Sequence, residues 1–321
     1  MPNVTGFPAR FPAVFSSLED WLIVKAFFCT APCAFFLYVN LVMLYTLRSK
    51  EIFTETPRYI LFSHLLVSDS LQLWCTLVYY ILYNQTFDQE TLKIIGVYCF
   101  LNYLVCRITN NYLTPLYLGL MSLERYIAIC FPLRHAEIAN KSRTMLAILS
   151  VWLLGLILWT ADLAAAMVLR GKEGGCTDYI IAQMVVTYQV NTALTGLVFS
   201  LVSVVIVCIY IAIMITAKSS STADKSKASK AHKTVLLHMV QLCLCLLSLL
   251  FGVVRRELGL SGLDPVLVNE VTIFLFLMFN ILPRCLSPLV YGLRDKTFKA
   301  YFKIHFLFCI KSKIQPSDLE I

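Results

Sequence analysis

The run FFCTAPCAFFLYVNLVMLYTL, residues 27–47, contains no Asp, Glu, Lys or Arg. A helix that crosses about 30 Å of hydrocarbon needs about 20 apolar residues. Six further apolar runs follow at 59–83, 94–130, 145–169, within 179–217, and at 234–254 and 271–291. None alternates apolar and polar residues as barrel strands do, and helices satisfy their own backbone amides in lipid. The sequence therefore predicts an all-α membrane protein, a bundle of seven transmembrane helices.

The composition also indicates that lipid is the solvent. Only 14% of the 321 residues are charged, against about 25% in soluble domains. Eighteen of the 27 Lys and Arg residues fall in the first, third and fifth connections, at one edge of the third run and in the tail; seven fall on the other side. Because positive loops stay in the cytoplasm, we expect a plasma-membrane protein with its N-terminus outside and its C-terminus inside. A basic soluble face is missing, which argues against nucleic acid as a partner.

These patterns divide the chain into three expected parts. Residues 1–26 form an extracellular N-terminus without the pattern of a cleaved signal peptide, residues 27–291 form the seven-helix domain, and residues 292–321 form a cytoplasmic amphipathic helix and tail. Asn3 and Asn84 begin glycosylation sequons on the outer side. In the tail, Cys309 is a candidate for palmitoylation. The helix before it should lie on the inner leaflet.

Two further cysteines fall on the outer side, where the compartment is oxidising. Cys99 lies at the outer end of the third run and Cys176 in the second outer connection. We expect them to form a disulfide. The other Cys spacings lack nearby His or carboxylates, so we expect no metal site.

The segment MSLERYIAICFPL, residues 121–133, closes the third run at its cytoplasmic end. It resembles the Met-Ala-x-Asp-Arg-Tyr-x-Ala-Ile-Cys-x-Pro-Leu segment of rhodopsin-like (class A) G-protein-coupled receptors of the odorant receptor family, most of all those of teleost fish. Other matching positions occur in the family's order: Asn40, Leu65, Asp69, Trp152, Tyr210, the segment from Lys230 to His238, Ser287, Pro288 and Tyr291. The chain departs from the pattern at Glu124, Val235, Ser287 and Gly292, and Cys99 lies 26 residues before Arg125, where the family's usual count is one fewer.

This resemblance implies an odorant receptor. Such a receptor binds a small odorant in a pocket on the extracellular side and activates a heterotrimeric G protein, with stimulatory coupling that raises cAMP. It is not an enzyme and needs no cofactor. One alternative is a rhodopsin-like receptor for a small lipid or other mediator. A more remote alternative is a transporter, which should show inverted repeats.

The resemblance also implies a switch at the cytoplasmic end. Glu124 should hold Arg125, beside Tyr126, in the resting state. Activation should swing the sixth helix outward and free Arg125 for the G protein. The residues expected to support or line this opening are Tyr210, Lys230, His238 and Tyr291.

Helical spacing relates a second charge in the third run, Arg107, to Arg125. Arg107 lies 18 residues before Arg125, which is five turns of an α-helix and about 27 Å. Both should then face the core, with Asn111 one turn below Arg107. In the receptors that this chain resembles, this depth of the third helix contacts ligands, so the resemblance implies that Arg107, Ile108, Asn111 and Tyr112 contact the ligand. An inward Arg can grip a carboxylate through two hydrogen bonds, so an acidic odorant is one hypothesis; a structural ion pair of Arg107 with Asp162 or Glu270 is the other.

Arg284 is a second charge inside a span, in a polar core that should also contain Asn40, Asp69, Ser287 and Pro288. Similar receptors hold sodium beside the residue equivalent to Asp69. We expect Arg284 to take that role by pairing with Asp69, which makes activation insensitive to sodium.

Overall fold

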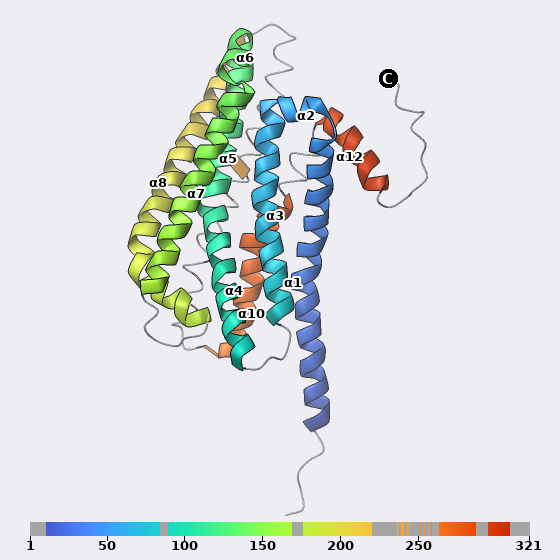
Figure 1. Ribbon diagram of the computed structural model, residues 1–321, viewed down its shortest axis with the longest axis vertical. Coiled ribbons are helices and arrows are strands. Elements are labelled where there is room, and N and C mark those ends of the chain that lie inside the picture. Colours follow the sequence, from blue (N-terminus) through green and yellow to red (C-terminus); the bar gives the residue numbers. More distant parts are fainter. Residues whose placement is uncertain are drawn as a thin grey trace, which may run out of the picture.

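The computed structural model describes residues 11–83, 89–168, 176–219, 263–286 and 295–308, with single positions between 236 and 258. Its long helices run side by side as a bundle (Figure 1). The elements are α1 (Phe11–Arg48), α2 (Glu51–Glu55), α3 (Pro57–Tyr83), α4 (Gln89–Ile108), η1 (Thr109–Leu113), α5 (Thr114–Cys130), η2 (Pro132–Arg134), α6 (His135–Ile138), α7 (Lys141–Val168), α8 (Cys176–Ser219), α10 (Pro265–Phe276), η3 (Leu277–Ile281) and α12 (Lys296–Phe308).

Within these residues, four helices are long and apolar enough to cross a membrane: Thr30–Arg48, Pro57–Leu82, Lys141–Ala161 and Ala193–Thr216. A fifth, Gly96–Cys130, turns by 115° into the short segment Pro132–Ile138. The expected sixth run lies almost wholly outside the described residues, and the seventh is described only as far as residue 286.

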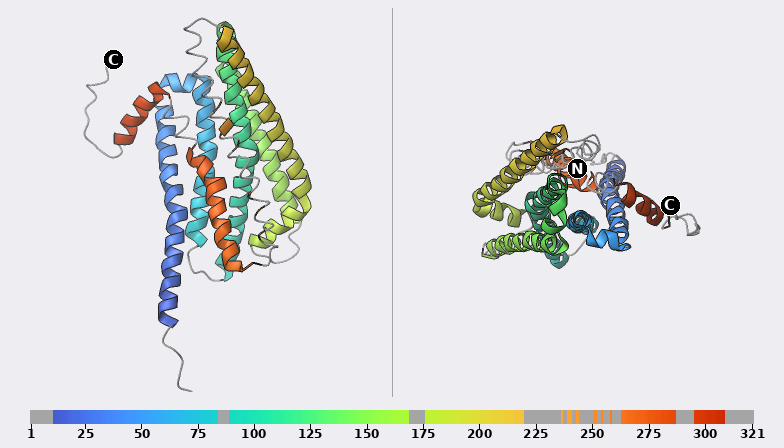
Figure 2. Two further views of the ribbon diagram at one scale, coloured as in Figure 1. Left: turned by 180° about the vertical axis from the view of Figure 1, so that it is seen from behind. Right: turned by 90° about the horizontal axis from the view of Figure 1, so that it is seen from above.

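The first helix is longer than its apolar run. It begins at Phe11, although the run predicts a span from residue 27, and its first turns project beyond the other helices (Figures 1 and 2). Apolar length marks the part of a helix that suits lipid and does not mark where the hydrogen-bonded helix ends. Residues 11–26, expected as part of a separate N-terminus, therefore continue the first membrane helix.

The first and third connections contain short helices that the apolar runs do not predict. α2 follows α1 directly, while η2 and α6 follow α5. α7 then begins with a polar cap, because Asn140 Oδ1 accepts a hydrogen bond from the backbone N–H of Arg143 at 2.8 Å.

The amphipathic helix that the sequence predicts after the seventh span forms as α12. It packs against other helices of the protein. Phe298 and Phe302 of α12 are buried, and the ring of Phe298 lies 5.8 Å from that of Phe53 in α2 and 6.1 Å from that of Phe62 in α3. α12 therefore docks on the end of α1, α2 and α3, away from α7 and α8 (Figure 2). Cys309 lies outside the described residues.

Candidate functional site

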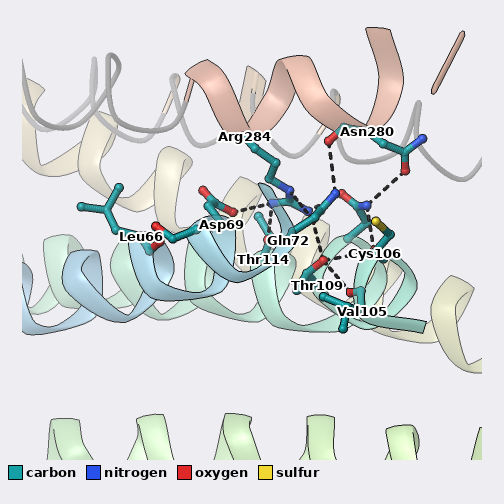
Figure 3. A network of polar contacts seen from close by, with 11 residues as sticks. Leu66, Asp69, Gln72, Val105, Cys106, Thr109, Thr114, Asn280 and Arg284 are labelled. Atoms are coloured by element: carbon teal, nitrogen blue, oxygen red, sulfur yellow. Dashed lines mark hydrogen bonds and ion pairs between the residues drawn. The ribbon is translucent and has the colours of Figure 1, made fainter. Parts of the chain in front are cut away.

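A buried polar cluster lies where α3, the third membrane helix (α4, η1 and α5) and the turn after η3 meet (Figure 3). Arg284 is at its centre, with none of its side chain exposed. Asp69 and Gln72 of α3 approach it from one side. Asn110 of η1 and Thr114 of α5, both in the third membrane helix, approach it from the other. A charge buried in a membrane protein is costly unless it is paired, so these contacts determine whether the cluster is stable.

The guanidinium of Arg284 has four acceptors. Nη1 donates to Asp69 Oδ1 at 3.0 Å, and Nε donates to Gln72 Oε1 at 3.0 Å. Nη1 also donates to the hydroxyl of Thr114, and Nη2 to the side-chain oxygen of Asn110. The ion pair of Arg284 with Asp69 that the sequence predicts is therefore present. The neutral acceptors help to offset the desolvation of the guanidinium.

Two π turns meet at this cluster. η1 ends two residues before Pro115, and η3 ends two residues before Pro283. Proline has no N–H to donate and its ring clashes with the carbonyl four residues earlier, and a π turn is one way for a helix to accommodate such a site. Asn110 Nδ2 donates to Asn280 Oδ1 at 3.1 Å, so one hydrogen bond joins the two turns.

The π turn overturns the prediction that Arg107, Asn111 and Arg125 share one face. That prediction assumed an unbroken α-helix, whereas a π turn holds one extra residue and rotates the outer part by about 100° relative to the inner part. Asn110, 2% exposed, takes the core position expected for Asn111, which is partly exposed. The sequence carried a sign of this, because the interval from Cys99 to Arg125 is one residue longer than the family's usual count.

Arg107 lies at a different part of the helix surface from Asn110. It forms a side-chain hydrogen bond with Tyr103 and lies close to Tyr112. The hydroxyl of Tyr112 accepts a hydrogen bond from Thr195 of α8 at 3.3 Å. Arg107 therefore lies beside two tyrosines of its own membrane helix, one of which contacts α8, while Asn110 contacts η3.

Ile108 also has a packing role. A Cβ added at Gly155 of α7 would lie 3.6 Å from Ile108 and 3.0 Å from Leu113. Gly155 thus lets the fourth membrane helix approach closely where the third widens into its π turn. The side chain of Asp162, one of the two partners considered for Arg107, is outside the described residues.

Polar contacts continue outward from Arg284. Thr109 donates to Gln72 Oε1 at 2.6 Å. Farther along the helices, Thr76 donates to Asn102 Oδ1 at 3.2 Å. A polar seam thus follows the contact between α3 and the third helix, although the sequence analysis singled out only Asp69 and Arg284. The sequence does not predict Gln72 and Thr109 as members of this seam, because an uncharged polar side chain inside an apolar run does not indicate which residue it contacts.

The end of the third membrane helix that precedes η2 contains the expected ion pair of Glu124 with Arg125. Arg125 Nε lies 2.8 Å from Glu124 Oε2, and Glu124 is 7% exposed. His135 of α6 supplies a contact that the sequence does not predict, with Nε2 3.5 Å from Glu124 Oε1. Glu124 therefore lies between Arg125 of its own helix and His135 of the following connection.

A second group of polar residues connects the start of α3, near Arg125, to α12. Asp295 precedes α12 and pairs with Arg58 at the start of α3. Tyr59 donates its hydroxyl to Asp295 Oδ2 at 3.0 Å, and Arg58 and Tyr59 both lie within electrostatic reach of Arg125. Asp295 Oδ1 also accepts the backbone N–H of Phe298 at 3.0 Å, the geometry of a helix N-cap.

The remaining predicted residues divide into two groups. Asn40 is fully buried, Trp152 Nε1 donates to His64 Nδ1 at 3.3 Å, and Tyr126 and Tyr210 are partly buried. Cys99 is disulfide-bonded. Its expected partner Cys176 begins α8, but the side chain is outside the described residues. Also outside them are Asn3, Asn84, Lys230, His238, Ser287, Pro288 and Tyr291.

Comparison with protein families gives one match across most of the chain. Residues 39–291 match the family described as 7 transmembrane receptor (rhodopsin family). The matched region begins one residue before the buried Asn40 and contains both the Arg284 cluster and the pair of Glu124 with Arg125.

Individual relatives agree with this match. The chain is 34% identical to Odorant receptor 131-2 of Danio rerio over 88% of its own length and 86% of the relative. It is 26% identical to Olfactory receptor 2T1 of Homo sapiens over 92% of the chain and 79% of the relative. It is 26% identical to Olfactory receptor 6E1 of Mus musculus over 83% of the chain and 84% of the relative.

Proposed function

The chain belongs to the rhodopsin family of seven-transmembrane receptors, and from this premise we propose that it is an odorant receptor that activates a heterotrimeric G protein. It is a multi-pass membrane protein of a receptor family, not of an enzyme family. The stimulatory subtype of G protein and a plasma-membrane location with the N-terminus outside are parts of the proposal. So are the pairing of Cys99 with Cys176, glycosylation at Asn3 and Asn84, and palmitoylation at Cys309.

The observation that carries the proposed coupling is the ion pair at the cytoplasmic end. Glu124 holds Arg125 beside η2 and α6, and a guanidinium in this place can be released to a partner without breaking the helix that carries it. We assign Tyr126, Tyr210 and Tyr291 to the support of the open state. Lys230 and His238 belong to the surface that meets the G protein. Release of Arg125 from Glu124 shifts the equilibrium between the resting and the open state of the receptor, as ligand binding does.

We place the odorant in the outer half of the bundle, beside Arg107, Ile108, Asn111 and Tyr112. The guanidinium of Arg107 has buried nitrogens and two phenol rings near it. An environment of this kind strengthens a bidentate contact between Arg and a carboxylate. The proposed ligand class is therefore a small organic acid.

The experiment for the function is a cAMP reporter in cells that display the receptor at their surface, challenged with acids, amines, alcohols and bile salts. We expect at least one acid to raise cAMP and the Arg125→Ala receptor, at equal surface level, to give no response. A response that survives Arg125→Ala would contradict the proposed coupling.

The ligand class has its own variant. Arg107→Ala should weaken the response to the best acid by about 100-fold in half-maximal concentration, since charge-assisted contacts to a buried carboxylate are worth about 3 kcal/mol. Its response to any active alcohol should change little. An Arg107→Ala receptor that responds fully to the best acid would refute the acidic ligand while leaving the receptor function intact.

A further inference from the structure

We propose that His135 is a second partner of Glu124, which takes over the carboxylate when Arg125 leaves it for the G protein. In the signalling state the protonated imidazole pairs with Glu124. The inference rests on the proposed function, because it concerns the pair of Glu124 with Arg125, but the function alone requires no histidine there. It is carried by the position of the imidazole, whose Nε2 lies 3.5 Å from Glu124 Oε1.

The turn after α5 brings His135 back to Glu124. His135 is 11 residues after Glu124, and in an unbroken α-helix the two would be about 16.5 Å apart along the axis. The chain instead leaves the α-helix at Phe131, and the segment Pro132–Ile138 turns by 115° from the helix before it. Because His135 begins α6, directly after this turn, its ring lies beside α5.

The imidazole is placed for an ion pair and has no other polar partner. His135 Nε2 is buried and forms no hydrogen bond with any residue that the structure describes. It faces Oε1 of Glu124, while the other oxygen, Oε2, lies 2.8 Å from Arg125 Nε. The two oxygens of one carboxylate thus face two different basic side chains. Arg125 is the close partner in the resting state, and His135 is within reach to replace it.

The surrounding charges favour this exchange of partners. The elements that pack most closely on α6 are α5 and η2. Their charged groups and those of α6 itself are Glu124, Arg125, Arg134 and Glu137. Glu137 is two positions from His135, a spacing at which helical side chains do not face each other. Glu124 therefore attracts a protonated His135 and Arg125 repels it, so departure of Arg125 leaves the attraction and removes the repulsion.

Release of Arg125 also creates a need for a new partner. Glu124 is 7% exposed, and a buried carboxylate that loses its partner is costly. A protonated imidazole offsets this cost without moving Glu124. The signalling state therefore binds the proton of His135 more tightly than the resting state does, and by linkage the same proton stabilises the signalling state.

This exchange makes signalling depend on pH at the end of the bundle that we place in the cytoplasm. Histidine is the side chain that normally changes its charge near neutral pH. Because the signalling state binds the proton more tightly, falling pH favours that state. The gain begins where His135 of the signalling state becomes protonated, and it stops once His135 of the resting state is protonated too. Signalling should therefore increase on acidification.

The first test measures proton binding by His135 in the purified receptor in nanodiscs, from the pH dependence of its histidine NMR signals. The chain has five His, and the signal that is lost in His135→Gln identifies the right one. Arg125→Ala mimics the departure of Arg125, so His135 should bind its proton about tenfold more tightly in this variant than in the wild type. In the control, Arg125→Ala combined with Glu124→Gln, the tighter binding should disappear.

The second test measures uptake of a non-hydrolysable GTP analogue by a stimulatory G protein without odorant, at pH 7.5 and 6.0, relative to His135→Gln at the same pH. Acidification should raise uptake in the wild type about tenfold, which corresponds to about 1.4 kcal/mol. His135→Lys keeps a positive charge at both pH values, so its uptake should be raised at both. The matched control is His305→Gln, a histidine of α12 that contacts Thr46 and should leave the pH response as in the wild type.

Equal proton binding by His135 in the wild type and in Arg125→Ala would overturn the proposal. So would wild-type uptake that matches His135→Gln at both pH values. If Arg125→Ala cannot be purified, the comparison of uptake in the wild type, His135→Gln and His135→Lys decides. Tighter proton binding in Arg125→Ala with no uptake in any receptor would support the exchange of partners and contradict the proposed coupling, so the two failures are distinguishable.

Discussion

Arg284 turns the middle of the bundle into a charged but paired site. Its ion pair with Asp69 is fully buried, and three neutral side chains accept three more of its N–H groups. Such a pair contributes little net stability compared with apolar packing, yet breaking one side leaves an uncompensated charge in a dry interior. Removing one partner and removing both should therefore have very different effects.

We expect Arg284→Gln to destabilise the receptor by about 3–5 kcal/mol, the usual cost of breaking a buried pair. The double variant Asp69→Asn with Arg284→Gln should recover most of this, because no charge remains unpaired. The measurement is the thermal midpoint of the purified receptor together with its surface level in cells. Equal losses in the single and double variants would show that the charges do not balance one another.

The same site predicts the response to sodium. Arg284 Nη1 is 3.0 Å from Asp69 Oδ1. The positive guanidinium therefore already neutralises the carboxylate beside which sodium would bind. Replacing sodium by choline should leave ligand affinity unchanged within about twofold, which is under about 0.5 kcal/mol. A clear dependence of affinity on sodium in the wild-type receptor would refute this role of Arg284.

Among the elements, α12 has one residue, Asp295, that makes several contacts at its start. Asp295 caps the helix through Phe298, pairs with Arg58 and accepts the hydroxyl of Tyr59. These contacts connect the start of α12 to the start of α3. The aromatic face of α12 then completes the docking on α2 and α3.

Asp295→Ala should loosen α12 by about 1 kcal/mol through the lost cap alone, and by more through the lost ion pair. Amide hydrogen exchange in residues 296–308 should become faster in the nanodisc-bound receptor. Lys299→Ala, an exposed change on the same helix, serves as the control. Unchanged exchange in Asp295→Ala would show that the aromatic contacts alone hold α12.

The docking of α12 should also depend on pH. Burial, and next the positive charge of Lys50, lower the pKa of His305 below its usual value of 6.5. The docked state then binds this proton less readily than the undocked state, so docking weakens as pH falls below about 6.5 and stops changing below the lowered pKa. The protection of the α12 amides, calculated after correction for the slower intrinsic exchange at low pH, should decrease between pH 7.5 and 5.5, and His305→Gln should remove this decrease. An identical pH response in that variant would assign it to another group.

At the scale of the whole molecule, apolar runs and their charges predicted the membrane helices well. These features follow from the length of a span and from the cost of charge in lipid. The pairs of Arg284 with Asp69 and of Arg125 with Glu124 were expected from the resemblance to the receptor family, which marks these positions as a polar core and a switch. Both are present in the structure.

Helical phase was not predictable in the same way. Counting at 3.6 residues per turn placed Asn111 in the core, and the π turn before Pro115 placed Asn110 there. A proline in the sequence indicates that the helical hydrogen bonding is interrupted. It does not indicate whether the helix bends there or forms a π turn. The contacts of Asp295 and His135 depend on how connections fold back, which the apolar pattern does not encode.

The expected topology is open to direct test. Epitope tags at the two ends of the chain should lie on opposite sides of the plasma membrane, with the N-terminal tag stained in intact cells and the C-terminal tag stained only after permeabilisation. Both tags on one side would require an even number of crossings, which the family and its switch do not allow.

The central claim is that a ligand releases Arg125 to a G protein, and reconstitution tests it most directly. The purified receptor in nanodiscs is mixed with a stimulatory G protein, and uptake of a non-hydrolysable GTP analogue is measured with and without the active odorant. We expect the odorant to accelerate uptake, Arg125→Ala to abolish the acceleration, and Glu124→Gln to raise uptake without odorant. An odorant that binds the receptor measurably and leaves uptake by the G protein unchanged would contradict the account.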